Sequence, residues 1–207
     1  MEQTEQMIEI LQKCYPDAKP ALVYRTAYEL LVAVILSAQC TDKRVNQVTS
    51  VLFEAHNTPS SMLELSEEEL GQIIFPCGLY RSKAKHILSA SRDILDKFGG
   101  EVPATIPELK SLAGVGQKTA NVVYSVWFGG DAIAVDTHVF RVSNRLGLAH
   151  ADTPFKTEED LKRSIPKELW SQAHHWLIYH GRQVCHSRHP DCERCALLHL
   201  CEYRKNS

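Results

Sequence analysis

Four cysteines near the C-terminus constrain the fold of this chain more than any other feature. Cys185, Cys192, Cys195 and Cys201 follow one another with the spacing C-x6-C-x2-C-x5-C. Four thiolates in so short a segment can hold a 4Fe–4S cluster or a tetrahedral zinc ion. Zinc ligands usually come in two close pairs, but only Cys192 and Cys195 form such a pair here. The wider outer spacing therefore favours the iron–sulfur cluster.

A disulfide framework is the less favoured alternative for these cysteines. The chain has seven cysteines, which is an odd number. The other three, Cys14, Cys40 and Cys77, are scattered through apolar stretches, where we expect each to act as a small buried hydrophobe. No pattern typical of a signal peptide precedes them, so we expect a reducing cytosol as the compartment.

Length and composition are those of an ordinary globular protein. The chain has 207 residues, of which 44% are hydrophobic and 23% charged, enough for one large domain or two smaller lobes. The longest unbroken apolar run, residues 30–36, is far shorter than the roughly 20 residues that span a bilayer, so we expect no membrane segment. The net charge of −2 does not by itself indicate a nucleic-acid binder.

Apolar residues recur at helical spacing nearly throughout, and we therefore predict an all-α fold of about ten helices. Val139, Val142 and Leu146, for example, mark the buried face of one helix. Capping patterns indicate two helix starts. Ser66 is followed three residues later by a glutamate, and Thr157 is followed three residues later by an aspartate.

The segment 109–123 reads as a helix, a tight G-x-G turn and a second helix. Gly114 and Gly116 let the backbone approach a ligand and leave N–H groups free at the start of the second helix. Such a turn is an anion site suited to one phosphate of a nucleic-acid backbone, without any reading of sequence. Taken alone, the two glycines fit a plain helical corner better.

The residues around this turn resemble a known family. LAGVGQKTA resembles the helix–hairpin–helix of the endonuclease III family of DNA glycosylases, and VDTHVFRVSNRLGL resembles the catalytic aspartate segment of that family. LSAQCTD and CGLYRSKA resemble its two DNA-probing loops, and the terminal cysteine spacing is similar to its cluster spacing. These matches lie in order from about residue 25 to residue 201.

The resemblance implies an all-α, two-lobed helix–hairpin–helix DNA glycosylase fold with a C-terminal 4Fe–4S cluster loop at residues 185–201. One lobe of six helices would cover residues 22–132 and carry the hairpin. The other, an iron–sulfur lobe, would combine residues 1–21 with residues 133–207. The cluster would organise a DNA-contacting loop and take no part in the reaction.

The implied function is base-excision repair by a bifunctional enzyme that removes oxidised pyrimidines and cleaves the abasic site by β-elimination. Its partner would be double-stranded DNA with damaged bases or abasic sites, and we expect a cytoplasmic, nucleoid-associated monomer. One alternative is a sister glycosylase for mismatched adenine or thymine. The other is a non-enzymatic redox or DNA-binding protein that uses the cluster.

Lys118 and Asp136 are the catalytic residues that the resemblance implies, and they would line the cleft that takes the flipped nucleotide. The positive end of a helix dipole disfavours an ammonium group at Lys118 and favours the free amine, which is the nucleophile. The amine would attack the sugar C1′ and form a Schiff base. Asp136 would stabilise positive charge on the sugar, although an acid just before a helix is also an ordinary N-cap.

The remaining implied residues contact DNA. A damaged base must leave the stack before the chemistry, and Gln39 would fill the gap while Leu79 wedges the opposite strand. Without the resemblance, Leu79 would read as a core leucine. Thr119 beside the hairpin, His138 after the catalytic aspartate, and Arg188 between the first two cluster cysteines complete the expected contacts.

Overall fold

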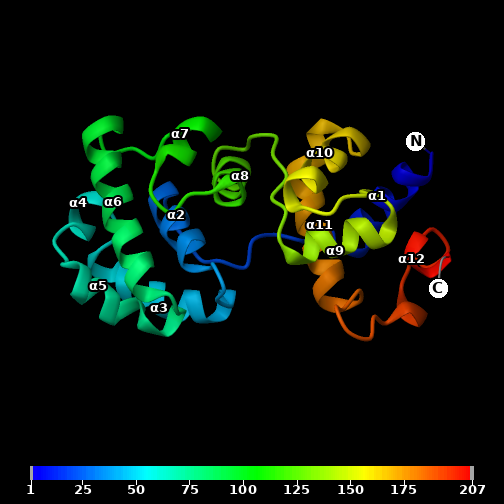
Figure 1. Cartoon of the computed structure of the whole chain (residues 1–207), viewed down its shortest axis with the longest axis horizontal. Helices are drawn as coiled ribbons and strands as arrows, with labels where there is room; N and C mark the ends of the chain where they lie inside the picture. The colour runs from blue at the N-terminus through cyan, green and yellow to red at the C-terminus, as the bar shows by residue number, and fades with distance from the viewer. Residues whose placement is uncertain (1, 206–207) are drawn as a thin grey trace. The chain divides into compact units, whose positions relative to one another are not determined.

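Helices make up all the regular secondary structure in residues 2–205, the part of the chain that the computed structural model describes. This part contains twelve α-helices and three short 3-10 helices and no β-strand, so the all-α prediction is confirmed (Figure 1). None of the described helices combines the length and the apolar character needed to cross a membrane.

Contacts divide the chain into two compact units. The first, here called the hairpin unit, is Pro20–Phe128, and the second, the cysteine unit, consists of the residues up to Lys19 and from Gly129 onward. We expected boundaries at residues 22 and 132. The outermost residues of the expected second lobe lie outside the described residues: Met1, Asn206 and Ser207.

The hairpin unit, all of whose residues are described, has seven α-helices where six were expected, because one additional turn forms at residues 59–62. Its elements are α2 (Ala27–Leu36), α3 (Asp42–Ala55), α4 (Pro59–Met62), α5 (Glu67–Ile74), the 3-10 helix η1 (Phe75–Cys77), α6 (Tyr80–Phe98), α7 (Ile106–Ser111) and α8 (Gln117–Val126).

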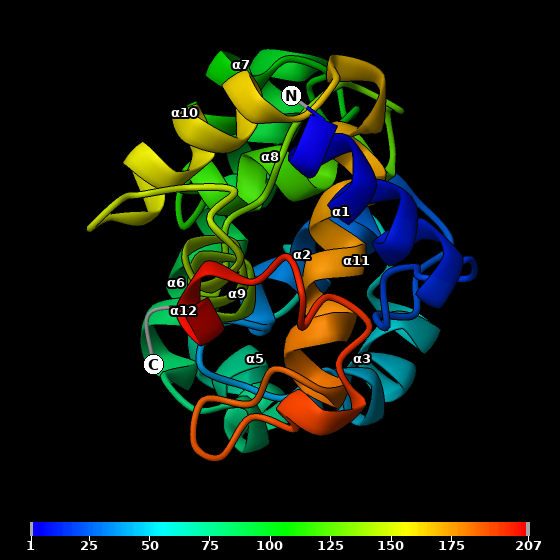
Figure 2. The ribbon, with the colours of Figure 1, turned by 90° about the vertical axis from the view of Figure 1, so that its right-hand side faces the viewer.

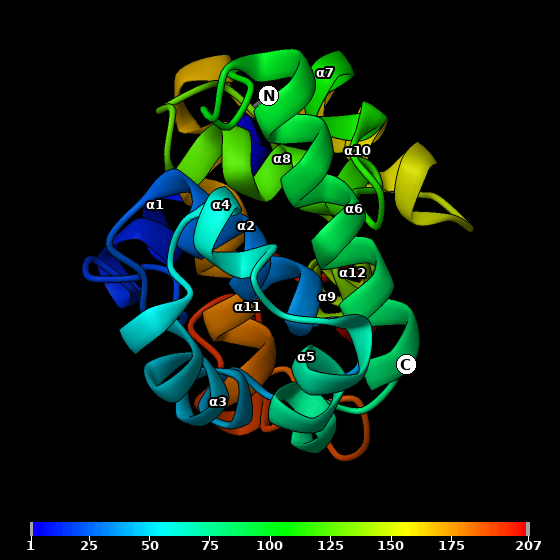
Figure 3. The ribbon, with the colours of Figure 1, turned by 90° about the vertical axis from the view of Figure 1, so that its left-hand side faces the viewer.

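The core of the hairpin unit is built around α2. Every residue of this helix from Tyr28 to Leu36 is buried, as expected of a helix that is apolar on all sides. Helices α3, α6 and α8 all contact it, and the long α6 also packs on α4 and α5 (Figure 3). The loop that follows α2 and the loop that precedes α6 are therefore both anchored on this core.

The cysteine unit combines the N-terminal helix with the C-terminal part of the chain. Its elements are α1 (Glu2–Cys14), α9 (Thr137–Leu146), α10 (Pro154–Ser164), η2 (Lys167–Leu169), α11 (Trp170–Gln183), η3 (Cys192–Arg194) and α12 (Glu202–Lys205). Helix α11 packs against both α1 and α9 (Figure 2). The predicted apolar face of α9 is confirmed, since Val139, Val142 and Leu146 are all buried.

The two capping predictions had different outcomes. The capping box at Ser66 is confirmed, because its hydroxyl accepts from the backbone N–H of Glu69, whose carboxylate accepts from the N–H of Ser66. The start at Thr157 is wrong, because Thr153 caps α10 and Thr157 lies buried inside the helix. Pro154 occupies the first helical turn, where its fixed φ and missing N–H cost nothing.

The three cysteines outside the C-terminal group are not all buried. Cys77 is buried as expected, but Cys40 is half-buried and Cys14 is exposed. Helix α1 buries Met7 and Leu11, and that face continues to Tyr15 beyond the helix end, so Cys14 falls beside it and faces solvent. The prediction of a buried Cys14 was therefore wrong, because the next residue, Tyr15, occupies the buried position.

Candidate functional site

The turn between α7 and α8 presents backbone to the outside. Gly114 has φ of 76°, in the left-handed region, and Gly116 has no neighbouring atom within 4 Å of the place where a Cβ would stand. Gly116 is the N-cap residue of α8, and no side chain caps this helix. The N–H groups of the first turn of α8 therefore have no partner inside the helix, as an anion site requires. The predicted helix–turn–helix is confirmed.

Lys118 is the second residue of α8, and its side chain is exposed. No other residue in the described part of the chain forms a hydrogen bond or ion pair with its amine. Thr119 follows it and is half-buried. The hairpin thus brings together the unpaired amino group of Lys118, the Thr119 hydroxyl and unpaired backbone N–H groups within one helical turn, beside the two glycines.

Asp136 is the N-cap of α9 and is half-buried. Its Oδ1 accepts hydrogen bonds from the backbone N–H groups of His138 and Val139, both at 2.8 Å. The N-cap expectation is therefore confirmed. Among the described residues, none donates to Oδ2. The cap fixes the carboxylate by one oxygen and leaves the other available.

His138 belongs to a network that joins α9 to the end of α11. Arg141 Nη2 donates to Nδ1 of His138 at 3.2 Å and to the carbonyl oxygens of Gly181 and Cys185, both at 3.0 Å. A Cβ on Gly181 would lie 3.1 Å from the Cβ of His138, so a glycine there lets the two helices approach closely. The ring of His138 is held half-buried.

The two loops that resemble DNA-probing loops share an unusual backbone. Gln39 has φ of 55° and Leu79 has φ of 49°, and among the described residues only one further non-glycine residue, His189, has a positive φ. Left-handed backbone costs a residue with a side chain roughly 1–3 kcal/mol and persists where the surroundings impose it. Gln39 is exposed. Leu79 is 54% exposed and is therefore no core leucine.

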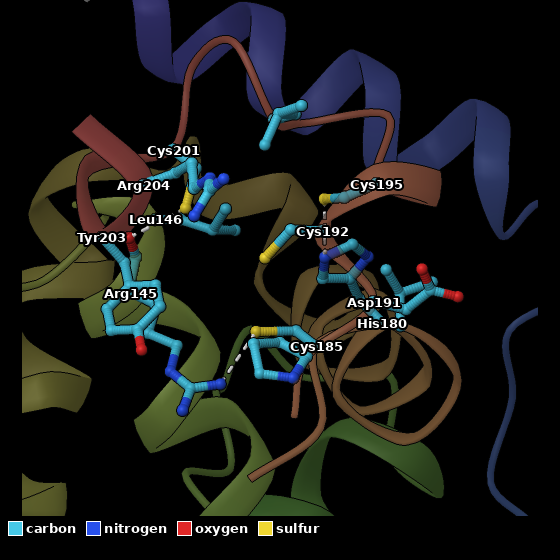
Figure 4. A pocket seen from close by; sticks show the side chains of 13 residues that line it. Arg145, Leu146, His180, Cys185, Asp191, Cys192, Cys195, Cys201, Tyr203 and Arg204 are labelled. Atoms are coloured by element: carbon cyan, nitrogen blue, oxygen red, sulfur yellow. Dashed lines mark hydrogen bonds between the residues drawn. The ribbon is translucent and has the colours of Figure 1, made fainter. Parts of the chain in front are cut away.

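The four C-terminal cysteines line one pocket of the cysteine unit (Figure 4). All four are half-buried and free of disulfides. The rest of the wall contains apolar residues, polar residues and charged residues: Leu146, Val184, Pro190, Leu198, Tyr203, Arg145, His180, Asp191 and Arg204. Among residues 3–205, whose side chains the structure describes, no three Cys, His, Asp or Glu side chains are grouped closely enough to hold a single metal ion. The four thiols thus surround one space, and their role as ligands of a single group stays a prediction.

The electrostatics of the pocket suit a group that neutralises several thiolates. Burial raises the pKa of Cys195, and the neighbouring charges of Cys201, Cys185 and Cys192 raise it further. Four thiolates around one space repel each other unless a cationic centre binds them. The donor set of this pocket thus fits a thiolate-bound metal cluster.

Two residues of the pocket wall, His180 and Arg145, were missed by the sequence reasoning. His180 contacts the Tyr15 hydroxyl through Nδ1 at 3.0 Å and the Cys195 sulfur through Nε2 at 3.6 Å. Burial lowers the pKa of His180 to about 4, so its ring is neutral near pH 7. Arg145 donates to the Cys185 sulfur at 3.5 Å and to the His186 carbonyl at 2.7 Å. Arg145 lies within the segment that resembles the catalytic aspartate segment, one helical turn after Arg141, but no local pattern indicated a contact with a cysteine.

Arg188 is exposed in the loop between the first two pocket cysteines. The loop is closed by a hydrogen bond from the N–H of Asp191 to the carbonyl of Val184 at 2.9 Å. Arg145 holds its middle by donating to the Ser187 carbonyl at 3.0 Å. Asp191, the acidic residue of this loop, forms an ion pair with Arg194 at 3.6 Å.

The predicted catalytic and DNA-contacting residues form three groups. Gly114, Gly116, Lys118 and Thr119 share the hairpin turn, and Gln39 and Leu79 lie on two loops of the same hairpin unit. In the cysteine unit, Asp136 and His138 lie at the start of α9. Arg141 hydrogen-bonds both His138 and the Cys185 carbonyl, and it thereby connects this helix start to the loop that carries Arg188. The joint action of Lys118 and Asp136 stays a prediction.

Comparison with known proteins gives one consistent result. Residues 32–167 match the sequence model of a family described as HhH-GPD superfamily base excision DNA repair protein. Endonuclease III of Bacillus subtilis (strain 168) is 49% identical over 202 residues, which cover 97% of this chain and 92% of that protein.

Solved structures agree with this similarity. A trapped endonuclease III–DNA covalent intermediate, an estranged-adenine complex, has a TM-score of 0.95 at 49% identity and covers 99% of this chain and 97% of its own. A thermostable thymine-DNA glycosylase has a TM-score of 0.87 at 21% identity and covers 100% of this chain and 98% of its own. The second similarity is one of fold alone.

Proposed function

This chain belongs to the HhH-GPD superfamily of base excision DNA repair proteins, as a DNA glycosylase with AP lyase activity of the endonuclease III type, and we propose that Lys118 is its nucleophile. The observation that carries this proposal is the exposed, unpaired amine of Lys118 in the first turn of an uncapped helix. A relative of this chain has been trapped in a covalent intermediate with DNA, and an amine forms such a bond.

In the proposed reaction the amine of Lys118 attacks C1′ of the damaged nucleotide. The base leaves with the electron pair of the glycosidic bond, and opening of the sugar ring gives a Schiff base between C1′ and the amine. The iminium makes the C2′ protons acidic. Loss of one of them expels the 3′ phosphate by β-elimination, which cleaves the strand.

Asp136 acts on the same nucleotide in this proposal. Its carboxylate stabilises the positive charge that develops on the sugar and assists removal of the proton from the attacking amine. The cap supports this role, because Oδ1 is held by two backbone N–H groups while Oδ2 has no donor among the described residues. A carboxylate fixed in this way needs little reorganisation when charge develops.

The DNA is held without reading its sequence. Backbone N–H groups at Gly114 and Gly116, with the Thr119 hydroxyl, bind a phosphate, and His138 and Arg188 face the backbone elsewhere. Gln39 fills the gap left by the flipped base, and Leu79 enters between the bases of the opposite strand. The exposure of both side chains supports the latter assignments.

We place a 4Fe–4S cluster on Cys185, Cys192, Cys195 and Cys201. The spacing of these residues and their location around one pocket support it. When bound, the cluster supplies a structural cross-link, because a short segment with little core of its own depends on its metal for order. The contacts from Arg141 and Arg145 then fix the loop of Arg188 to α9.

The substrate class in this proposal is double-stranded DNA that carries oxidised pyrimidines or abasic sites. The full chain acts as a monomer in the cytoplasm, at the nucleoid. A relative solved in complex with DNA supports the DNA partner.

A panel of duplexes tests the function. The purified protein is incubated with an oxidised pyrimidine, an abasic site, uracil, a mismatched adenine and a mismatched thymine, with and without borohydride. We expect strand cleavage and a covalent adduct on the first two duplexes. Removal of a mismatched base without an adduct would indicate the sister glycosylase, and binding without cleavage on every duplex would indicate a non-enzymatic protein.

A further inference from the structure

Lys83 is a lysine buried in the hairpin unit. It lies in the first turns of α6, and its relative exposure is 3%. Its Nζ donates to three backbone carbonyl oxygens, those of Leu36 (2.8 Å), Ala38 (2.8 Å) and Cys77 (2.9 Å). An ammonium group has three N–H donors, so every donor of Lys83 is used.

These three carbonyls belong to the two loops that carry Gln39 and Leu79. Leu36 ends α2, and Ala38 directly precedes Gln39. Cys77 lies two residues before Leu79 in the other loop, and the backbone N–H of Lys83 itself donates to the Leu79 carbonyl at 3.0 Å. One side chain therefore joins two loops whose sequences lie about 40 residues apart.

Both joined loops contain a strained residue. Gln39 and Leu79 have left-handed backbones without being glycine, and such a conformation persists only where the surroundings impose it. Burial and the neighbouring thiol of Cys40 raise the pKa of Cys77, so the two loops also lie close together at these thiols. The bonds from Lys83 thus fall beside both strained residues.

A role in stability alone does not explain why a charged residue, Lys83, is buried at this position. Burial lowers the pKa of Lys83, since desolvation disfavours the ammonium form. A buried ion pair can often be replaced as a whole by well-packed apolar side chains without loss of stability. What an apolar residue cannot do is hold three carbonyls around one point, and this is the geometric property that the two loops use.

We propose that Lys83 is a positioning residue that holds the Gln39 loop and the Leu79 loop in the relative arrangement in which both side chains enter the duplex together. This inference rests on the proposed function, because it takes Gln39 and Leu79 as the residues that replace the flipped base. Lys83 itself touches neither DNA nor the reacting atoms.

The test compares two rates in the full-length enzyme. One is single-turnover excision of an oxidised pyrimidine from a duplex, and the other is borohydride trapping on a single-stranded abasic site, where no base has to leave a duplex. Lys83→Met removes the three donors with little change in volume. We expect the ratio of duplex rate to single-strand rate to fall at least about tenfold, because misplacement of groups by about 1 Å costs rates on this scale.

Ser91→Ala is the matched control. Ser91 is also buried on α6, and its hydroxyl hydrogen-bonds the Tyr28 hydroxyl at 2.5 Å and the Ile87 carbonyl at 2.7 Å, away from both loops. We expect Ser91→Ala to leave the ratio of the two rates unchanged. An unchanged ratio in Lys83→Met, or an equal fall in both variants, would overturn the positioning role.

Two further outcomes are also decisive. If Lys83→Met does not fold, Lys83→Arg is measured, because its longer planar group keeps the charge but cannot place three donors around the same point. A ratio below that of the wild type supports the proposal, and a wild-type ratio overturns it. If the wild-type protein traps neither the duplex nor the single-stranded abasic site, the proposed function is wrong, and the role of Lys83 that rests on it is wrong as well.

Discussion

His86 on α6 lies directly against Gly114 in the hairpin turn. A Cβ on Gly114 would stand 2.8 Å from the Cβ of His86, and the φ of Gly114 is 76°. Gly116, two residues later, has φ of −88° and open space around it. The two glycines therefore serve different purposes, the first for the shape of the turn and the second for the approach of a ligand.

Alanine at each position separates these purposes. Gly114→Ala forces a side chain into the left-handed region and against His86, and we expect it to lower the free energy of unfolding by about 2 kcal/mol. Gly116→Ala should change it by less than about 0.5 kcal/mol. We expect Gly116→Ala nevertheless to weaken DNA binding about tenfold, the equivalent of one hydrogen bond to a charged group.

Chemical denaturation and DNA-binding titrations measure both effects. Equal destabilisation by the two substitutions would show that Gly116 is also part of the structure of the turn. Unimpaired DNA binding by a stable Gly116→Ala protein would contradict the assignment of a phosphate site to the hairpin.

Asp136→Asn separates the charge of the carboxylate from its cap. Asparagine caps a helix about as well as aspartate, so the thermal stability should be unchanged, while excision should slow by about 100-fold because the charge is lost. Asp136→Ala should lose the same activity and in addition about 1 kcal/mol of stability, because it removes the acceptor for His138 and Val139. Normal turnover of a stable Asp136→Asn protein would reduce Asp136 to a helix cap.

Part of this arrangement could be read from the sequence. The pattern V-D-T-H before the apolar spacing of α9 predicted both a cap and a helix, because a short acidic side chain and a periodic face are local properties. The start of α10 was misplaced because the capping pattern at Thr157 falls inside the helix, whereas the true cap, Thr153, precedes a proline that fits the first helical turn.

Other features depend on contacts that no local pattern reports. A lysine in a helix is expected at the surface, and the carbonyls that bury Lys83 include one 47 residues away in the chain. The left-handed backbones of Gln39 and Leu79 could not be predicted either, since residues other than glycine rarely adopt this conformation. The surrounding structure imposes it, and the resemblance supplied only the two positions.

Replacement of Gln39 and Leu79 together by alanine tests the flipping assignment. Removal of a base from a duplex costs a few kcal/mol of unstacking and unpairing, part of which the inserted side chains recover. We therefore expect the double variant to lose at least about tenfold more activity on a duplex lesion than on a single-stranded abasic site. Equal losses on both substrates would mean that these residues support the core or the active site instead.

The four-cysteine pocket predicts bound iron and sulfide. Protein purified anaerobically should be yellow-brown with broad visible absorbance, and Cys192→Ser should lose the iron together with DNA affinity or folding. Cys14→Ser is the control, because Cys14 is exposed in the same unit and away from the pocket. Stoichiometric zinc without iron, in protein from iron-replete cells, would contradict the cluster assignment.

Borohydride trapping by Lys118→Gln tests the central claim most directly. Lys110→Gln removes the same charge from the neighbouring helix α7, where the Lys110 amine donates to the Gln117 side chain at 2.8 Å, and it serves as the matched control. Both variants should still bind duplex DNA, since the backbone of the turn provides the phosphate contacts. We expect the covalent protein–DNA adduct to fall to background in Lys118→Gln and to persist in Lys110→Gln. An adduct at the wild-type level in Lys118→Gln would show that another group attacks C1′ and would contradict the account.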